Sequence, residues 1–240
     1  MVTAFDTDAV DFLERLGVSS YKLASHSLTN ITLLNYLASI GKPTVLSTGM
    51  AEWDEIDNAV EIFNSHDCPL ALLHCVSSYP TPLEDCNLEM INVLKNRFDL
   101  PVGYSGHELG CLPSVSAVAM GAKIIERHFT LDKKMVGFDH KISLEPEELI
   151  RMVNEIRNVE KVLGSGEKNV SDTEMVTRKK YHVSAVSARL IRCGSTLSEA
   201  DITYRNPGSG IPAKKAKEII GKKALFDIKE DKLLTFEMFQ

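Results

Sequence analysis

The sequence predicts an α/β fold, an incomplete (β/α)8 TIM barrel of about six strand–helix units followed by a small, mostly β domain. Three observations support this prediction. Short apolar runs alternate with amphipathic segments at spacings of roughly 20 to 30 residues over residues 2–164, which is typical of a parallel sheet covered by helices. Polar residues end several of these runs, as they do at the carboxyl face of a barrel. After residue 180 the pattern changes to short β-type pieces separated by turns.

Six apolar runs predict the strands of the barrel. A closed barrel has eight strands, so two strand–helix units are expected to be missing. The chain begins almost directly on a strand, which places the missing units at the amino end, and an incomplete barrel would leave two strand edges open to pairing. The six runs are Val2–Phe5, Ser20–Leu23, Thr44–Ser47, Leu70–His74, Val102–Ser105 and Lys123–Phe129.

Capping residues mark the helices between these strands. Asn30 precedes an apolar segment that stops at Gly41, as expected for a helix with a polar N-cap and a glycine C-cap. Glu145-Pro146 opens a long periodic segment that runs to Leu163 and is followed by Gly164. Both segments are therefore predicted to be helices.

The chain divides into two predicted domains. Residues 1–165 form the partial barrel, the polar residues 166–180 form a linker with a basic cluster at its end, and residues 181–240 form the small domain. In the small domain one helix is expected near Ala213–Ile220. Its β-type pieces are Val183–Val186, Ile202–Tyr204, Ala224–Ile228 and Leu233–Phe236.

The composition excludes several classes of protein. With 44% hydrophobic and 25% charged residues the chain is globular, and its net charge of −6 is spread without a basic surface for nucleic acid. No apolar stretch approaches the roughly 18 residues of a membrane-spanning helix, and no signal-peptide pattern opens the chain. The five cysteines form no C-x-x-C pair, which predicts free thiols in a reducing compartment. We therefore expect a soluble, cytoplasmic protein that binds neither nucleic acid nor membrane.

Two histidines end neighbouring apolar runs and predict a metal site. His74 follows Leu70–Leu73, and His107 lies just beyond the next strand, so both imidazoles are expected at the same barrel mouth. Neutral imidazoles bind divalent transition metals, and two protein ligands leave positions for water and a substrate oxygen. For each histidine taken alone, a hydrogen-bonded core residue is the alternative interpretation.

Further polar residues at the strand ends predict an anion site. Lys22 lies inside an apolar run, and Ser25 and Ser47-Thr-Gly49 add hydroxyls and flexible backbone at the same rim, although a salt bridge inside the barrel would also explain the lysine. By strand alternation Glu126 and His128 point one way and Arg127 the other, either toward a substrate or into a structural ion pair. Asp139 and His140, on the next loop, are acid–base candidates.

Five ordered motifs resemble the sialic acid (N-acetylneuraminate) synthase family. The resemblance runs from Thr3 to the end of the chain, because the small β domain is similar to that family's antifreeze-like (SAF) domain, a β-clip fold. The motifs are Ser47-Thr-Gly-Met50, His74–Pro82 (HCVSSYPTP), Gly103–Glu108 (GYSGHE), Ile125–Asp132 (IERHFTLD), and Gly137–His140 (GFDH) with Ser143–Pro146 (SLEP).

The resemblance implies a transferase that condenses phosphoenolpyruvate with N-acetylmannosamine, its 6-phosphate or a related N-acyl aminosugar, and releases phosphate. It implies a divalent ion on His74 and His107, manganese first, with magnesium or cobalt as alternatives. The ion would polarise the sugar aldehyde and activate a water for attack at C2. A domain-swapped homodimer is implied as well.

The residues expected to form the site come from both domains. Two departures from the family concern the sugar: Ser27 replaces an acidic residue, and Asn206 stands where the family has an arginine, with Arg205 displaced by one position. N-acetylneuraminate stays the leading product, and because of these departures other nonulosonates such as legionaminate or pseudaminate are further candidates. The catalytic residues expected are Lys22, Glu126, Asp139 and His140, and the substrate-binding residues are Lys22, Ser25, Ser47, Ser77, Tyr79, Ser105, Arg205 and Asn206.

Two other functions stay open at this point. The family's barrel has two earlier strand–helix units, which carry a further acidic residue and a lysine for phosphoenolpyruvate, and this chain contains neither. A non-catalytic binding or assembly module of the same family is thus the first alternative. A metal-dependent aldolase or hydrolase on the same barrel is the second.

Overall fold

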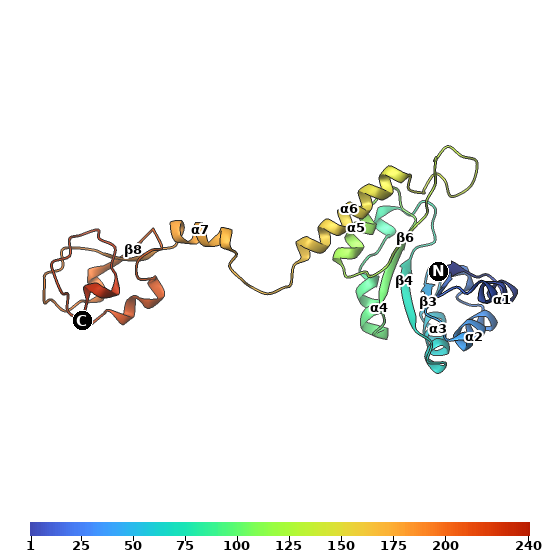
Figure 1. The fold of residues 1–240 in the computed structure, drawn as a ribbon, viewed down its shortest axis with the longest axis horizontal. Coiled ribbons are helices and arrows are strands. Elements are labelled where there is room, and N and C mark those ends of the chain that lie inside the picture. Colours follow the sequence, from blue (N-terminus) through green and yellow to red (C-terminus); the bar gives the residue numbers. More distant parts are fainter. The chain divides into compact units, whose positions relative to one another are not determined.

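A computed structural model describes residues 1–240, which form two compact units, Met1–Gly166 and Glu167–Gln240. The first unit contains a curled, six-stranded parallel sheet in which each strand pairs with its neighbours in sequence (Figure 1). The predicted fold class, six strands of an eight-stranded barrel with helices, is confirmed. The strands are β1 (Val2–Thr3), β2 (Tyr21–Leu23), β3 (Thr44–Ser47), β4 (Leu70–Cys75), β5 (Val102–Gly106) and β6 (Ile125–Arg127).

Helices connect the strands, and the predicted caps close two of them. The Asn30 side chain accepts a hydrogen bond from the backbone N–H of Leu33, and Gly41 ends the same helix in the left-handed conformation. Glu145 and Glu148 form a capping box at the start of the long helix. The helices of this unit are α1 (Thr7–Leu16), α2 (Ile31–Ile40), α3 (Trp53–Ser65), α4 (Met90–Phe98), α5 (Leu112–Ala119) and α6 (Pro146–Leu163), with short 3-10 turns η1 (Ser25–Ser27) and η2 (Leu83–Asp85).

The hydrophobic core lies between one face of the sheet and the helices. Leu46 and Leu72 of the strands and Phe63 of α3 are fully buried there. Because side chains alternate along a strand, the neighbouring residues face the inside of the curled sheet. Pairing brings three such residues into register across β4, β5 and β6, namely Cys75, Ser105 and Glu126.

The second unit is held together by single bridges more than by long strands. Only β7 (Ser184–Ser187) and β8 (Ile202–Arg205) form a ladder, which is antiparallel. The pieces predicted at 224–228 and 233–236 are not strands; Ile228 and Leu233 make one bridge each, and residues near 213–220 form a 3-10 turn instead of an α-helix. Its 3-10 turns are η3 (Glu199–Asp201), η4 (Ala213–Glu218) and η5 (Phe236–Met238).

A helix, α7 (Asp172–Tyr181), occupies most of the segment that the sequence pattern suggested as a linker. Ser171 caps it by accepting a hydrogen bond from Glu174 N, and acidic residues in the first turn with basic residues in the last complement its dipole. Gly208 N donates to the Lys179 carbonyl (2.8 Å), which ties α7 to the rest of the second unit. None of the helices is both long and apolar enough to cross a membrane.

Candidate active site

A cavity of about 450 Å³ opens at the carboxyl ends of the parallel strands. Eight of the residues that the sequence predicted for the site line it, and they come from all the strands or strand ends between β2 and β6. These are Lys22, Ser25, Ser47, Ser77, Tyr79, Ser105, His107 and Glu126, joined by Cys75 and His128 among others.

Lys22 and Glu126 form one wall of the cavity. The Lys22 ammonium is 3.4 Å from the Glu126 carboxylate and donates a hydrogen bond to the Leu23 carbonyl (3.0 Å). Only 7% of the lysine side chain is exposed. Ser105 Oγ donates to the same carboxylate (2.7 Å). Lys22 and Glu126 therefore form an ion pair, which was the alternative interpretation of each residue. Both also line the cavity, where either group can face a ligand.

A ring of hydroxyls lies beside this pair. Ser25 Oγ accepts a hydrogen bond from Gly49 N (3.0 Å). Ser47 Oγ is buried and has no hydrogen-bond partner. A buried hydroxyl left unpaired is unfavourable by about 1–3 kcal/mol, so this group needs a ligand oxygen or a water. A Cβ at Gly49 would meet Ser77 Oγ and Ser25 Oγ, so glycine keeps the space between the hydroxyls open.

The structure does not bring His74 and His107 together, contrary to the prediction. His74 lies on the helix-facing side of β4, where its Nε2 shares a hydrogen bond with the Cys86 carbonyl oxygen (2.8 Å) and its ring packs near Tyr104. It borders a different cavity, between the loops that follow β3 and β4. Alternation along the strand is the physical reason, since the next residue, Cys75, is the one that reaches the predicted site.

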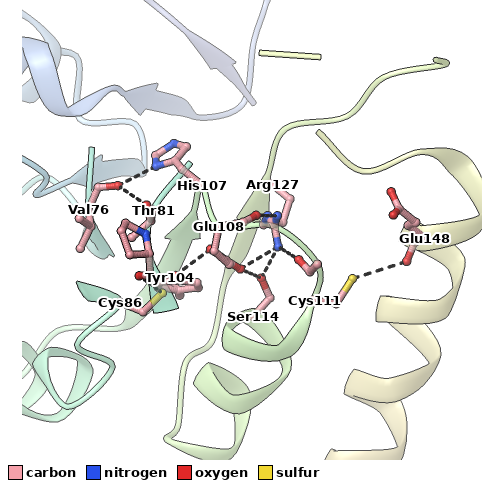
Figure 2. Close-up of polar contacts among 12 residues, drawn as sticks. Val76, Thr81, Cys86, Tyr104, His107, Glu108, Cys111, Ser114, Arg127 and Glu148 are labelled. Carbon is pink, nitrogen blue, oxygen red and sulfur yellow. Dashed lines mark hydrogen bonds and ion pairs between the residues drawn. The ribbon is translucent and has the colours of Figure 1, made fainter. Parts of the chain in front are cut away.

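The imidazole that does lie beside His107 is that of His128. The two ring centroids are 5.2 Å apart, and both rings line the cavity with Tyr79, whose ring centroid is 4.2 Å from that of His107. His107 Nδ1 is 2.9 Å from the Val76 carbonyl oxygen (Figure 2). That acceptor assigns the proton to Nδ1 and leaves the Nε2 lone pair free.

The protonation of these two rings is set by their surroundings. Burial and the neighbouring His107 lower the pKa of His128, so its ring is neutral at pH 7. Burial alone would lower the pKa of His107, but hydrogen bonds to Cys75 and to the Val76 carbonyl raise it above its usual value. Burial also lowers the pKa of His74.

Besides His74, four predicted residues lie outside the cavity lining. Asp139 Oδ2 is 3.8 Å from His128 Nδ1, so it faces the cavity's histidine from the loop after β6. His140 Nδ1 is 2.7 Å from Thr130 Oγ1, within that loop. Arg205 and Asn206 belong to the second unit, where Arg205 pairs with Asp231 (3.0 Å).

Sequence reasoning placed His128 on the same strand face as Glu126 but did not predict it as a metal ligand, and it did not consider Cys75. No three His, Cys, Asp or Glu side chains are grouped so that they could hold a metal ion by themselves. The two imidazoles of His107 and His128 are consistent with a site that leaves several positions to water and substrate. The arrangement thus combines two imidazoles of the kind that bind metals with a buried cation and a row of hydroxyls, of which that of Ser47 is unpaired.

Comparison with known proteins identifies matches along the whole chain. The NeuB family model matches residues 1–168, and the SAF domain model matches residues 182–240. An uncharacterized protein of Methanocaldococcus jannaschii is 46% identical over 236 residues, which cover 98% of this chain and 70% of that protein. The N,N'-diacetyllegionaminic acid synthase of Campylobacter jejuni is 40% identical over 235 residues, covering 97% of this chain and 70% of that enzyme.

Other matched relatives are named N-acetylneuraminate-9-phosphate synthase and pseudaminic acid synthase. Among solved structures, the N-acetylneuraminic acid synthetase of Leptospira borgpetersenii superposes with a TM-score of 0.69 at 42% identity, covering 73% of this chain and 61% of that one. The chain therefore spans 61 to 70% of the length of these three proteins, from Methanocaldococcus, Campylobacter and Leptospira. Since the family model accounts for residues 1–168 of 240 and the predicted resemblance is confirmed, this chain belongs to the NeuB family and carries a SAF domain.

Proposed function

We propose that this chain is a nonulosonate synthase that joins phosphoenolpyruvate to the open-chain form of an N-acyl hexosamine and releases phosphate. The observation that carries this proposal is the cavity itself, in which a buried lysine, an unpartnered buried hydroxyl and two adjacent imidazoles face one space. Homologues named as legionaminic, pseudaminic and sialic acid synthases support the reaction class.

Lys22, Ser25 and Ser47 would bind phosphoenolpyruvate. The ammonium of Lys22 neutralises one anionic group, and the unpaired Ser47 hydroxyl donates to an oxygen of the ligand. The Gly49 N–H already points at Ser25, and the absence of a side chain there lets a phosphate or carboxylate approach the backbone. Ser77 and Ser105 extend the same row of hydroxyls toward the sugar.

His107 and His128 would hold a divalent ion, manganese first, with magnesium or cobalt as alternatives. The residues fit such an ion because His107 has its Nδ1 engaged by a carbonyl and both rings lie within one cavity. When bound, the ion supplies Lewis-acid polarisation of the sugar carbonyl. His74 has no part in this site.

In the proposed reaction C3 of phosphoenolpyruvate forms a bond to the aldehyde carbon of the sugar, a water oxygen bonds to C2, and the C2–O bond to phosphate breaks. The aldehyde oxygen gains a proton, and the water gives up its protons as the product and phosphate form. Glu126, held by Ser105 and Lys22, is placed to accept a proton from that water. Tyr79 stacks beside His107 and would orient the sugar, and Asp139 would keep the His128 ring in place.

We also propose a cytoplasmic homodimer in which the small domain of one copy, with Arg205 and Asn206, closes the barrel mouth of the other. The sugar stays open between an N-acylmannosamine, its 6-phosphate and the precursors of legionaminate and pseudaminate. Light scattering of the purified chain tests the dimer.

One experiment tests the function directly. The chain is incubated with phosphoenolpyruvate, MnCl2 and each of the candidate hexosamines, and both phosphate and the nonulosonate product are measured. Equal yields of the two products, abolished by EDTA and by His128→Ala, are expected. Calorimetric binding of phosphoenolpyruvate and Mn²⁺ without turnover would favour the binding module, and consumption of a sugar without consumption of phosphoenolpyruvate would favour an aldolase or hydrolase.

A further inference from the structure

A buried ion pair lies directly behind the two imidazoles. Glu108 is fully buried, and Arg127 exposes only 2% of its side chain. Arg127 Nη1 donates to Glu108 Oε1 (2.8 Å), and Tyr104 Oη and Ser114 Oγ donate to the same carboxylate (2.9 and 3.1 Å) (Figure 2). The pair is therefore closed off from water, and all three hydrogen bonds to the Glu108 carboxylate come from residues of the first unit.

Arg127 also binds the backbone that follows β5. Its Nη2 donates to the Glu108 carbonyl (2.6 Å), and Nη1 donates to the Gly110 carbonyl (2.7 Å). The guanidinium makes these contacts although its Nε is left without a partner. One side chain of β6 thus fixes the path of the loop between β5 and α5 at two carbonyls and one carboxylate.

The chain positions of this pair connect it to the cavity. Glu108 follows His107, and Arg127 precedes His128. Each imidazole lines the cavity, whereas the neighbouring Glu108 carboxylate and Arg127 guanidinium both bond to Ser114 of α5 (3.1 Å each). His107 is additionally held by its own contacts, Nδ1 to the Val76 carbonyl and its carbonyl from Thr81 N (3.2 Å).

We propose that Glu108 and Arg127 are positioning residues that set the separation of His107 and His128, so that both imidazoles can bind the same divalent ion. This inference rests on the metal site of the proposed function. Stability alone does not account for such a pair, because replacing a buried ion pair with neutral groups of similar size is often neutral or stabilising. What neutral groups cannot reproduce is the fixed fork of hydrogen bonds from Arg127 to the loop that carries His107.

The test is Mn²⁺ binding by the full chain, followed by the electron paramagnetic resonance signal of free Mn²⁺. The main variant is the double substitution Glu108→Gln with Arg127→Met, which removes both charges and leaves no buried charge unpaired. Arg127→Lys is the conservative variant, since it keeps the charge opposite Glu108 but cannot bind Glu108 and the two carbonyls together. Glu14→Gln is the matched control, because Glu14 pairs with Lys42 (2.6 Å) just before β3, at the amino ends of the strands.

The double variant should stay folded but melt below the wild-type temperature, because the Glu108 and Gly110 carbonyls lose their donor. It should bind Mn²⁺ about tenfold or more weakly, the usual effect of losing an outer-shell contact. Arg127→Lys should fall between the double variant and the wild type, and Glu14→Gln should bind Mn²⁺ like the wild type. A folded double variant or Arg127→Lys variant with wild-type affinity would overturn the positioning role while leaving the metal site intact. A wild-type chain that binds no Mn²⁺, or binds it equally well after His128→Ala, would overturn the metal site and this inference with it.

Discussion

Replacing His74 with alanine should lower the melting temperature of the first unit without weakening Mn²⁺ binding. Replacing His128 with alanine should weaken Mn²⁺ binding and change the melting temperature little. The His74 ring is 6% exposed, and its loss leaves the Cys86 carbonyl without its 2.8 Å partner. An unpaired buried carbonyl is unfavourable by about 1–3 kcal/mol, and the cavity left by the ring adds about 1 kcal/mol. The total of about 3 kcal/mol corresponds to a decrease of about 6 to 12 °C for a unit of this size.

His128 is the contrasting case. Its side chain is 35% exposed, and its charged neighbour, Asp139, is 3.8 Å away. Its loss should therefore destabilise the unit by less than about 1 kcal/mol. The assays are thermal unfolding by circular dichroism in EDTA and Mn²⁺ titration of each variant, with His74→Gln as a control that can still donate to Cys86. Loss of Mn²⁺ binding by His74→Ala at an unchanged melting temperature would show that His74, and not His128, is the second ligand.

Three more predictions follow from the site and from the two cores. Gly49→Ala should weaken phosphoenolpyruvate binding about tenfold by calorimetry with little change in melting temperature, because the new Cβ lies 2.8 Å from Ser25 Oγ and displaces a hydroxyl; unchanged affinity would show that the hydroxyls do not bind this ligand. Leu34→Ala, at a fully buried position of α2, should destabilise the first unit by about 2–5 kcal/mol in urea unfolding, and a loss under about 1 kcal/mol would contradict the packing described. Hydrogen bonds from Ser198 and the nearby Arg189 lower the pKa of Asp201, although burial acts in the opposite direction. The ionised carboxylate therefore stabilises the fold fully above the pKa of an unfolded Asp, about 3.9, and this stabilisation is lost as the pH falls through the folded pKa. The melting temperature of Asp201→Asn should depend less on pH than that of the wild type between about pH 5 and 2, and parallel curves would contradict this stabilising role.

The strands and the capped helices of the first unit could be predicted because each has a strong local signal. Apolar runs such as Thr44–Ser47 match β3 residue for residue, and Asn30 and Gly41 bound α2 as expected. The second unit lacks such signals. Ile228 and Leu233 make isolated bridges that depend on distant partners, and α7 has no apolar stripe, so only its caps mark it as a helix.

The sequence predicted which strands contribute residues to the cavity. It did not predict which of two adjacent residues on a strand points its side chain into the cavity. Lys22 within the short strand β2 and Ser47 at the end of β3 both reach the cavity. His74 also lies near a strand end, but it is in register with Tyr104, whereas Cys75 is in register with Ser105. The register between strands determines which of two adjacent residues faces inward, and it is fixed by packing across the sheet, which a single sequence does not reveal.

The order of strands in the sheet has a consequence for how the protein is made. Every paired strand is the next one in sequence, and the paired residues are between 19 and 30 positions apart. Such short loops close at low entropic cost, so a chain leaving the ribosome can add one strand–helix unit after another. Lys22 and Ser47 are in place early in this order, and His128 emerges last of the cavity's residues. The two proposed metal ligands would thus be complete only after the anion-binding groups have emerged, with α6 of the first unit still to follow.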